Sequence, residues 1–199
     1  MRIQIFIASS LELKPERQEL AYMVSQLNAH LEDFDIYIRI VKWEYVDSSM
    51  SYRHKQEDYN DELKNSDLCF FLFWTRLGIY TQEELNLANS LTSSSKKQLK
   101  VFYLFKDSTD SVSQELSCLQ HKIETDQHFN CSHFSTTYQL DLFVTNSILL
   151  YIIEYIHKRK TINERDEKLA IILDKIIVKS NSCSNSKELS LLLSQIATY

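Results

Sequence analysis

Glycine and proline are almost missing from this chain of 199 residues, which has one of each, Gly78 and Pro15. The two glycine-rich loops that hold nucleotide phosphates, GxGxxG and GxxxxGK[ST], both need more than one glycine. The usual dinucleotide fingerprint and the P-loop are therefore excluded. Tight turns must be built from Asn, Asp and Ser, whose side chains form hydrogen bonds in turns.

Motifs for metal binding and nucleophilic catalysis are missing as well. The four cysteines form no CxxC pair, and the six histidines form no HxxxH or HExxH pair. The chain also lacks the GxSxG turn that presents a catalytic serine. We therefore expect no metal site, and we expect Cys69, inside an apolar run, to be a small core residue.

Basic and acidic residues are nearly balanced, with a formal net charge of −5. This argues against a nucleic-acid-binding surface, which usually shows a basic excess. The N-terminus lacks the long apolar region of a signal peptide. No window approaches the roughly 18 uninterrupted apolar residues of a membrane span. The sequence predicts a cytoplasmic protein that binds neither nucleic acid nor membrane.

Short apolar runs alternate with segments of helical periodicity, which indicates βαβ units and a parallel sheet. Five strands at this spacing predict an α/β protein with a flavodoxin-like, doubly wound sheet in the order 2-1-3-4-5. Strands are expected at residues 3–9, 34–46, 68–74, 100–106 and 128–134, and helices at 10–31, 55–65, 81–94, 111–123 and 138–160.

Residues 161–199 differ from the rest of the chain. Apolar residues recur at helical spacing over 163–179, a polar hinge follows at 180–186, and a further helix begins at 187. We therefore expect one domain over 1–160 and, over 161–199, a helical extension or a linker to a further module. Apolar residues near the end suggest either a natural chain that continues beyond residue 199 or an association surface.

Ligands of doubly wound sheets bind at the carboxyl ends of the strands, where the strand order reverses. This rule selects the loops after the first and third expected strands, "ASSLELK" and "FWTRLGIYTQEE". The second loop carries the only glycine, for which we expect a positive φ or a close approach to a ligand. An ordinary turn without a ligand is the alternative.

The segments "IFIASSLELKPERQEL", "KWEYV" and "NSDLCFFLFWTRLGIYTQEELNLA" together resemble the TIR-like family of bacterial defence and signalling proteins. The resemblance covers about residues 3–160 and is most specific in "TxEELxxA". It implies an enzyme that cleaves NAD⁺ between nicotinamide and ribose, with NAD⁺ as substrate and no cofactor. It also implies activation by self-association, a role in antiphage defence, and a C-terminal sensor, NTPase or repeat module as partner.

In enzymes of this family the catalytic glutamate begins a pattern that here fits Glu84 to Ala88, so the resemblance implies Glu84 as the catalytic residue. Glu83, one residue early, is the second choice. Such a carboxylate can stabilise the oxocarbenium-like state of ribosyl transfer. The alternative is purely structural: Glu84 would complete a capping box with Thr81 as the N-cap.

Other side chains in this region have a binding and a structural interpretation each. Trp74 and Tyr80 can stack on a base, while a tryptophan at a strand end can equally be the edge of the core. Arg76 can pair with the pyrophosphate or be solvated. Trp43 can line the far wall of the pocket or pack.

The loop after the first expected strand offers two hydroxyls. Ser9 and Ser10 can meet ribose or phosphate, or cap the first helix. Arg17, with Glu16 beside it, is expected on a solvated helix face. Both loops would thus contribute to one site.

Three functions are consistent with these features of the sequence. The first is an NAD⁺ glycohydrolase that is inactive until it oligomerises. The second is a non-catalytic TIR-like module that signals by self-association. The third is a nucleoside or nucleotide N-glycosidase, resembling deoxyribosyltransferases, which uses the same glutamate.

Overall fold

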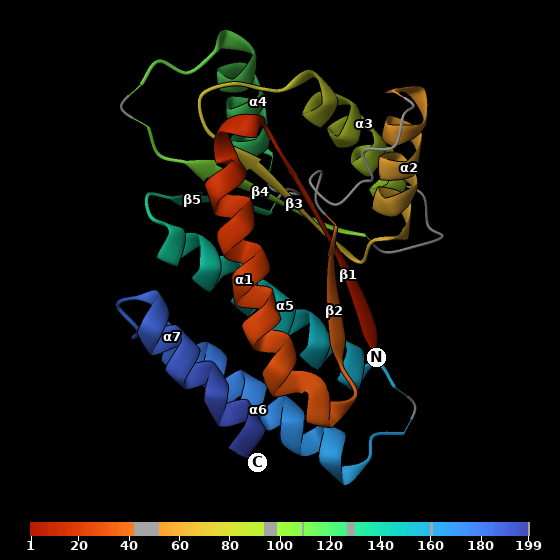
Figure 1. The fold of residues 1–199 in the computed structure, drawn as a ribbon, viewed down its shortest axis with the longest axis vertical. Coiled ribbons are helices and arrows are strands. Elements are labelled where there is room, and N and C mark those ends of the chain that lie inside the picture. Colours follow the sequence, from red (N-terminus) through yellow and green to blue (C-terminus); the bar gives the residue numbers. More distant parts are fainter. Residues whose placement is uncertain (42–51, 94–98, 109, 127–129, 160, 199) are drawn as a thin grey trace. The chain divides into compact units, whose positions relative to one another are not determined.

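The structure, a computed structural model, describes residues 1–41, 52–93, 99–108, 110–126, 130–159 and 161–198. Its five strands form one sheet in the order β2-β1-β3-β4-β5, which confirms the predicted flavodoxin-like order (Figure 1). The pairs β1–β3, β3–β4 and β4–β5 are parallel. The strands are β1 (Arg2–Ser9), β2 (Tyr37–Val41), β3 (Leu68–Phe73), β4 (Lys100–Lys106) and β5 (Asn130–Phe134).

Seven α-helices are described, and the five expected between and after the strands are all present. Their bounds are α1 (Lys14–Leu31), α2 (Tyr52–Asn65), α3 (Ile79–Ser93), α4 (Gln114–Thr125), α5 (Thr137–His157), α6 (Glu164–Ser180) and α7 (Ser186–Leu193). Short 3-10 turns, η1 (Leu11–Leu13), η2 (Glu32–Phe34) and η4 (Ser194–Thr198), lie beside them.

The chain divides into two compact units. One, the sheet unit, contains residues 2–17 and 38–135; the other, the helical unit, contains residue 1 and residues 18–37 and 136–199. The division crosses α1 and β2. The helical unit joins α6 and α7 to α5 and to most of α1, whereas the sequence placed a domain boundary at residue 160. That boundary remains a prediction.

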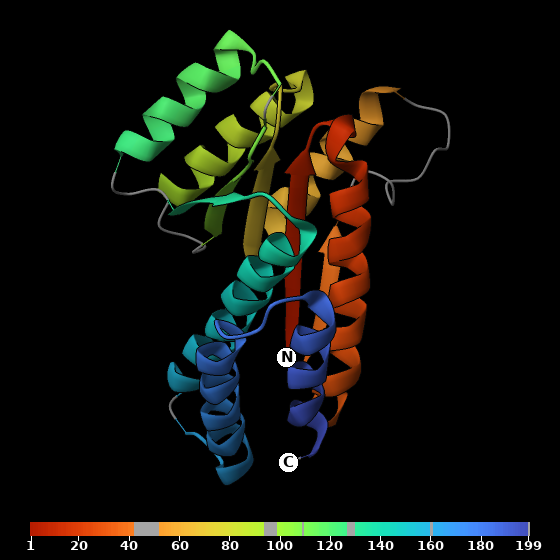
Figure 2. The same ribbon diagram turned by 90° about the vertical axis from the view of Figure 1, so that its left-hand side faces the viewer.

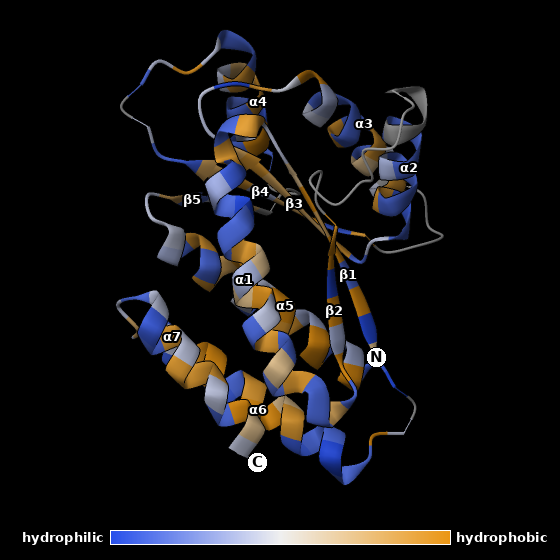
Figure 3. Cartoon of the chain, viewed as in Figure 1, coloured by the Kyte–Doolittle hydropathy of each residue, from blue (hydrophilic) through white to orange (hydrophobic). Residues whose placement is uncertain are grey.

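The core of the sheet unit lies between one face of the sheet and three helices. All six residues of β3 are buried, and this strand is hydrophobic along its length (Figure 3). Because side chains alternate across a strand, Cys69, Phe71 and Phe73 share one face, where they pack with α2, α3 and α4 (Figures 1 and 2). Cys69 is fully buried, as expected.

The helical unit has its own core. Helix α5 buries Val144, Ile148, Leu149 and Ile152, and the Thr145 hydroxyl lies 3.1 Å from the Met23 sulfur of α1. By length and composition alone, α5 is the one described helix that could cross a membrane, and 44% of its apolar window is buried in the fold. Cytoplasmic location stays a prediction.

Candidate functional site

The loops after β1 and β3 meet at the carboxyl ends of these strands. Ser9 ends β1 and is paired with Leu72, one residue before the end of β3. Glu12, just after β1, accepts hydrogen bonds from the Thr75 hydroxyl at 2.6 Å and from the Thr75 backbone N–H at 3.1 Å. The two loops that the sequence analysis selected are therefore joined, and Glu12 joins them.

Glu12 is held as a carboxylate by these contacts. Its Oε1 also accepts from the Ser10 hydroxyl at 2.9 Å and from the Arg76 backbone N–H at 3.4 Å. Burial would raise the pKa of Glu12, but the hydrogen bonds from Thr75, Ser10 and Arg76 outweigh it and lower the pKa. Glu12 thus serves as a fixed acceptor that positions the backbone of the β3 loop.

Arg17 lies inside this site and not on a solvated face, so that expectation was wrong. Only 2% of Arg17 is exposed, and Glu16 is buried too. The Arg17 guanidinium donates to the Ser9 hydroxyl and, at 2.9 Å, to the Ser10 carbonyl oxygen. One turn of α1 therefore places a buried cation against the end of β1.

Glu84 lies on α3 and is 3% exposed. Burial raises the pKa of Glu84 from 4.5 to about 8, and the charge of Glu83 adds to this rise. A hydrogen bond with Gln56 and the nearby positive charge of Arg17 act in the opposite direction. Carboxyls in which burial and specific neighbours compete over the charge are characteristic of functional sites.

Gln56 reaches Glu84 from α2, whose position is set by a buried tyrosine. Tyr59, three residues later and hence on the same helix face, donates to the Ile7 carbonyl oxygen at 3.1 Å. Its ring lies 4.4 Å from that of Phe6. The Gln56 Nε2 also donates to Asn60, whereas the Gln56 Oε1 is buried without a partner among the described residues.

The capping box predicted at Thr81 is wrong, because α3 begins at Ile79 and not after Thr81. The Gly78 carbonyl oxygen accepts the first helical hydrogen bond, from the Gln82 N–H at 3.0 Å, so Gly78 occupies the N-cap position. Thr81 and Glu84 lie within the helix and are both buried. Glu84 is therefore not an N3 capping residue, and the interpretation of Glu84 as part of a capping box is wrong.

Gly78 does not adopt a positive φ, so this expectation is also wrong. Its role is close approach: a Cβ at this position would lie 3.3 Å from Thr81 Oγ1 and 3.9 Å from Ser10 Cβ. The missing side chain lets the β3 loop run beside the β1 loop. The partner in this approach is protein, whereas a ligand at Gly78 remains a prediction.

Trp74 directly follows β3, and a lysine covers its ring. The Lys106 ammonium lies 4.1 Å from the ring centroid and 2.6 Å from Glu16 Oε1. The indole Nε1 is buried and has no partner among the described residues. A base can stack on Trp74 only where Lys106 leaves it free.

The remaining predicted residues lie at the edge of this site or outside it. Arg76 and Glu83 are exposed, and the backbone of Arg76, not its guanidinium, contacts Glu12. Tyr80 is 44% exposed at the start of α3. Ser10 precedes η1 but its side chain makes no cap hydrogen bond, so it does not act as a helix cap. Trp43 lies outside the described residues.

Comparisons with known proteins add little to this geometry. No family model and no curated protein matches the sequence. Among solved structures, the chain is similar to a 2-desoxiribosyltransferase from Leishmania mexicana, with 15% sequence identity and a TM-score of 0.32. The similarity covers 62% of this chain and 98% of that one. At these values we draw no functional conclusion from it.

Proposed function

We propose that this chain is a TIR-type NAD⁺ glycohydrolase that breaks the bond between nicotinamide and ribose, with Glu84 as the catalytic carboxylate. The observation that carries the proposal is the buried Glu84, whose pKa is raised to about 8, near the buried Arg17 at the carboxyl ends of β1 and β3. The position of Glu84 in the family's pattern, E-[apolar]-x-x-A, supports the same assignment.

The chemistry requires an anion beside a sugar that becomes positively charged. Cleavage of a ribosyl bond passes through an oxocarbenium-like state, which a nearby carboxylate stabilises. The same carboxylate can orient the hydroxyls of the ribose. The nicotinamide ring of NAD⁺ carries a positive charge, and a cation close to Glu84 favours the ionised form of its carboxyl. Substrate binding would therefore generate the carboxylate that the reaction needs.

In this proposal, side chains of the two loops and of the start of α3 would bind the rest of NAD⁺. The Ser9 and Ser10 hydroxyls lie at the end of β1, where they suit ribose hydroxyls. The exposed guanidinium of Arg76 suits the pyrophosphate, because Arg pairs with phosphate oxygens in a bidentate manner. Tyr80, which is 44% exposed, offers a ring face for a base.

In this proposal the enzyme needs activation because Glu84 is shielded from solvent. At 3% exposure the carboxyl is shielded, so NAD⁺ reaches it only after its surroundings move. We propose that self-association supplies this movement, so that a sensor or NTPase partner controls the enzyme in antiphage defence. A population shift of this kind needs a contact that favours the open state over the closed one.

The test is incubation of the full chain with NAD⁺ at low and high protein concentration, with and without a crowding agent. The proposal expects nicotinamide release that rises more steeply than protein concentration and is lost in Glu84→Gln. The matched control is Glu83→Gln, which changes the exposed neighbour and should retain activity. Release of base from nucleosides but not from NAD⁺ would identify a nucleoside N-glycosidase instead. Filaments or oligomers without any release would identify a non-catalytic signalling module.

A further inference from the structure

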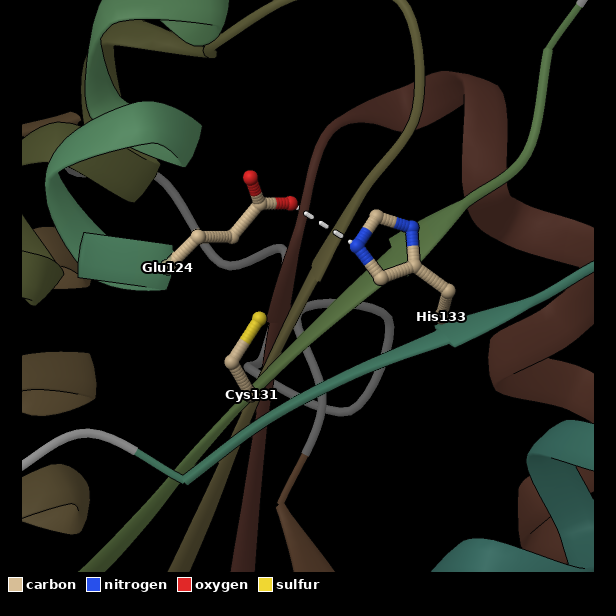
Figure 4. Close-up of side chains that lie close together, drawn as sticks. All are labelled: Glu124, Cys131 and His133. Carbon is tan, nitrogen blue, oxygen red and sulfur yellow. Dashed lines mark hydrogen bonds and ion pairs between the residues drawn. The ribbon is translucent and has the colours of Figure 1, made fainter. Parts of the chain in front are cut away.

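A second group of reactive side chains lies on β5, an edge strand of the sheet, and on the neighbouring helix α4. Cys131 and His133 are two residues apart on β5 and therefore project from the same face of the strand. Glu124 comes from the last turn of α4. One ligand atom from each of the three residues lies within 4.8 Å of the others, and Figure 4 shows the Cys131 sulfur directed toward the gap between Glu124 and His133.

We propose that Glu124, Cys131 and His133 bind a divalent transition metal, Zn²⁺ in the first instance. A thiolate, an imidazole nitrogen and a carboxylate oxygen form a mixed ligand set that suits Zn²⁺ better than Mg²⁺ or Ca²⁺, which prefer oxygen alone. Three protein ligands leave the fourth tetrahedral position for water or another ligand. This site is independent of the function proposed for Glu84.

The geometry requires only small side-chain movements. Metal–ligand bonds of about 2.0–2.3 Å in a tetrahedron place ligand atoms about 3.3–3.7 Å apart. His133 Nε2 and Glu124 Oε1 are now 2.9 Å apart in a direct hydrogen bond, and an ion would replace that bond by separating the two atoms slightly. Both side chains are more than one-third exposed, so an ion can enter from solvent.

The other imidazole nitrogen faces a carboxylate, an arrangement common around metal-binding histidines. His133 Nδ1 lies 3.4 Å from Asp107 Oδ1, and Asp107 accepts a hydrogen bond from Ser135. Metal-binding histidines usually donate their second N–H to such a group, which fixes the tautomer and ring orientation. Ring stacking on Phe105, at 5.7 Å between centroids, further restrains His133.

Charge also favours an ion at this place. An ionised Cys131 would face the Glu124 carboxylate, whose oxygen lies within 4.8 Å of the Cys131 sulfur. A bound divalent cation removes the repulsion between this thiolate and the carboxylate, because the two groups together neutralise its two positive charges. The thiol proton is released to solvent when the metal binds. The ion would then link α4 to the edge strand β5.

The test uses Co²⁺ and Zn²⁺ with the reduced full chain. Co²⁺ should give the near-ultraviolet charge-transfer band of a cobalt–thiolate bond, and equimolar Zn²⁺ should abolish it. Cys131→Ser should remove the band, and His133→Gln should weaken binding at least about 10-fold, while Asp107→Asn weakens it about 10-fold. Cys118→Ser, which changes the exposed cysteine of α4, should bind like the unchanged chain.

A second measurement needs no variant. Zn²⁺ should protect Cys131 from alkylation by iodoacetamide while Cys118 stays reactive, as read by peptide mass spectrometry. The proposal is overturned if saturating Co²⁺ gives no thiolate band. It is equally overturned if the band persists in Cys131→Ser, or if Zn²⁺ leaves the alkylation of Cys131 unchanged.

Discussion

The buried Arg17 guanidinium donates a hydrogen bond to the Ser9 hydroxyl, which fixes the end of β1 beside the helix that follows it. The same cation lies close enough to Glu84 to lower its pKa against the larger effect of burial. One side chain thus orders a proposed substrate-binding hydroxyl and adjusts the proposed catalytic carboxyl.

Arg17→Gln should raise the pKa of Glu84, because it removes the nearby positive charge. In the proposed enzyme kcat/KM reports the free enzyme, so it should rise with pH to a plateau above about 8 in the unchanged chain. In Arg17→Gln the midpoint of this rise in kcat/KM should move to higher pH. In Arg17→Lys the midpoint should move less. Lost hydrogen bonds to a charged group should cost about 1.5–3 kcal/mol of unfolding free energy. An unchanged midpoint would show that Arg17 does not act on the titrating group.

Glu12→Gln should loosen the β3 loop, because the carboxylate accepts from the hydroxyl and backbone of Thr75. Amide hydrogen exchange should accelerate at Thr75 and Arg76 and remain unchanged within β3. The pKa of Glu12 is lowered in the folded chain, so its contribution to stability is present above the unfolded pKa and is lost as pH falls through the folded pKa. Acid sensitivity of this loop should therefore weaken in the variant. Equal exchange in both chains would contradict this role.

Gly78→Ala should be tolerated, because Gly78 does not use a positive φ. The added Cβ would lie 3.3 Å from Thr81 Oγ1, so the Thr81 side chain must move by a few tenths of an ångström. We expect a change of less than about 1 kcal/mol in unfolding free energy, measured by urea titration. Gly78→Val adds bulk toward Ser10 and should reduce NAD⁺ cleavage more than stability. A large loss of stability in the alanine variant would show that the close approach is rigid.

Asp141→Asn should stabilise the helical unit at neutral and basic pH. Burial raises the pKa of Asp141 from 3.8 to about 7, with a further contribution from Glu19, and its Oδ1 has no partner among the described residues. The folded state therefore holds a proton that the unfolded state releases, so stability falls as pH rises from about 4 to 7. The variant should gain about 2 to 4 kcal/mol at pH 8 and lose this pH dependence. Glu19→Gln should give a smaller gain.

The strands were predictable because they depend on local patterns, and their order because strands that alternate with helices form a doubly wound parallel sheet. The uninterrupted apolar run at 68–73 predicted a buried central strand, and β3 is buried at every residue. The same reasoning failed at the start of α3, where "T-x-x-E" suggested a cap at Thr81. The helix instead begins at Ile79, with Gly78 as the N-cap. Thr81 and Glu84 therefore lie within the helix, where their side chains are buried.

The candidate site was harder to predict because its members come from different elements. Glu84 was identified by its pattern and Ser9 and Ser10 by their place after β1. Nothing in the sequence separates the buried Arg17 from a solvated helix arginine, and Gln56 is one polar residue in a polar helix. Cys131 and His133 match no metal motif of helical or CxxC spacing, because a strand brings residues i and i+2 together on one face.

The central claim is that Glu84 is buried for catalysis at a cost in stability, and paired measurements on Glu84→Gln test it most directly. Raised from 4.5 to about 8, its pKa makes wild-type stability fall as pH rises through that range. The neutral amide should therefore gain between about 2 and 5 kcal/mol of unfolding free energy at pH 8. Nicotinamide release from NAD⁺ should fall at least about 100-fold in the same variant. Glu83→Gln removes only a smaller contribution to the pKa of Glu84, so it should change both quantities far less. Unchanged release together with lower stability in Glu84→Gln would show that Glu84 is a structural residue and contradict the account.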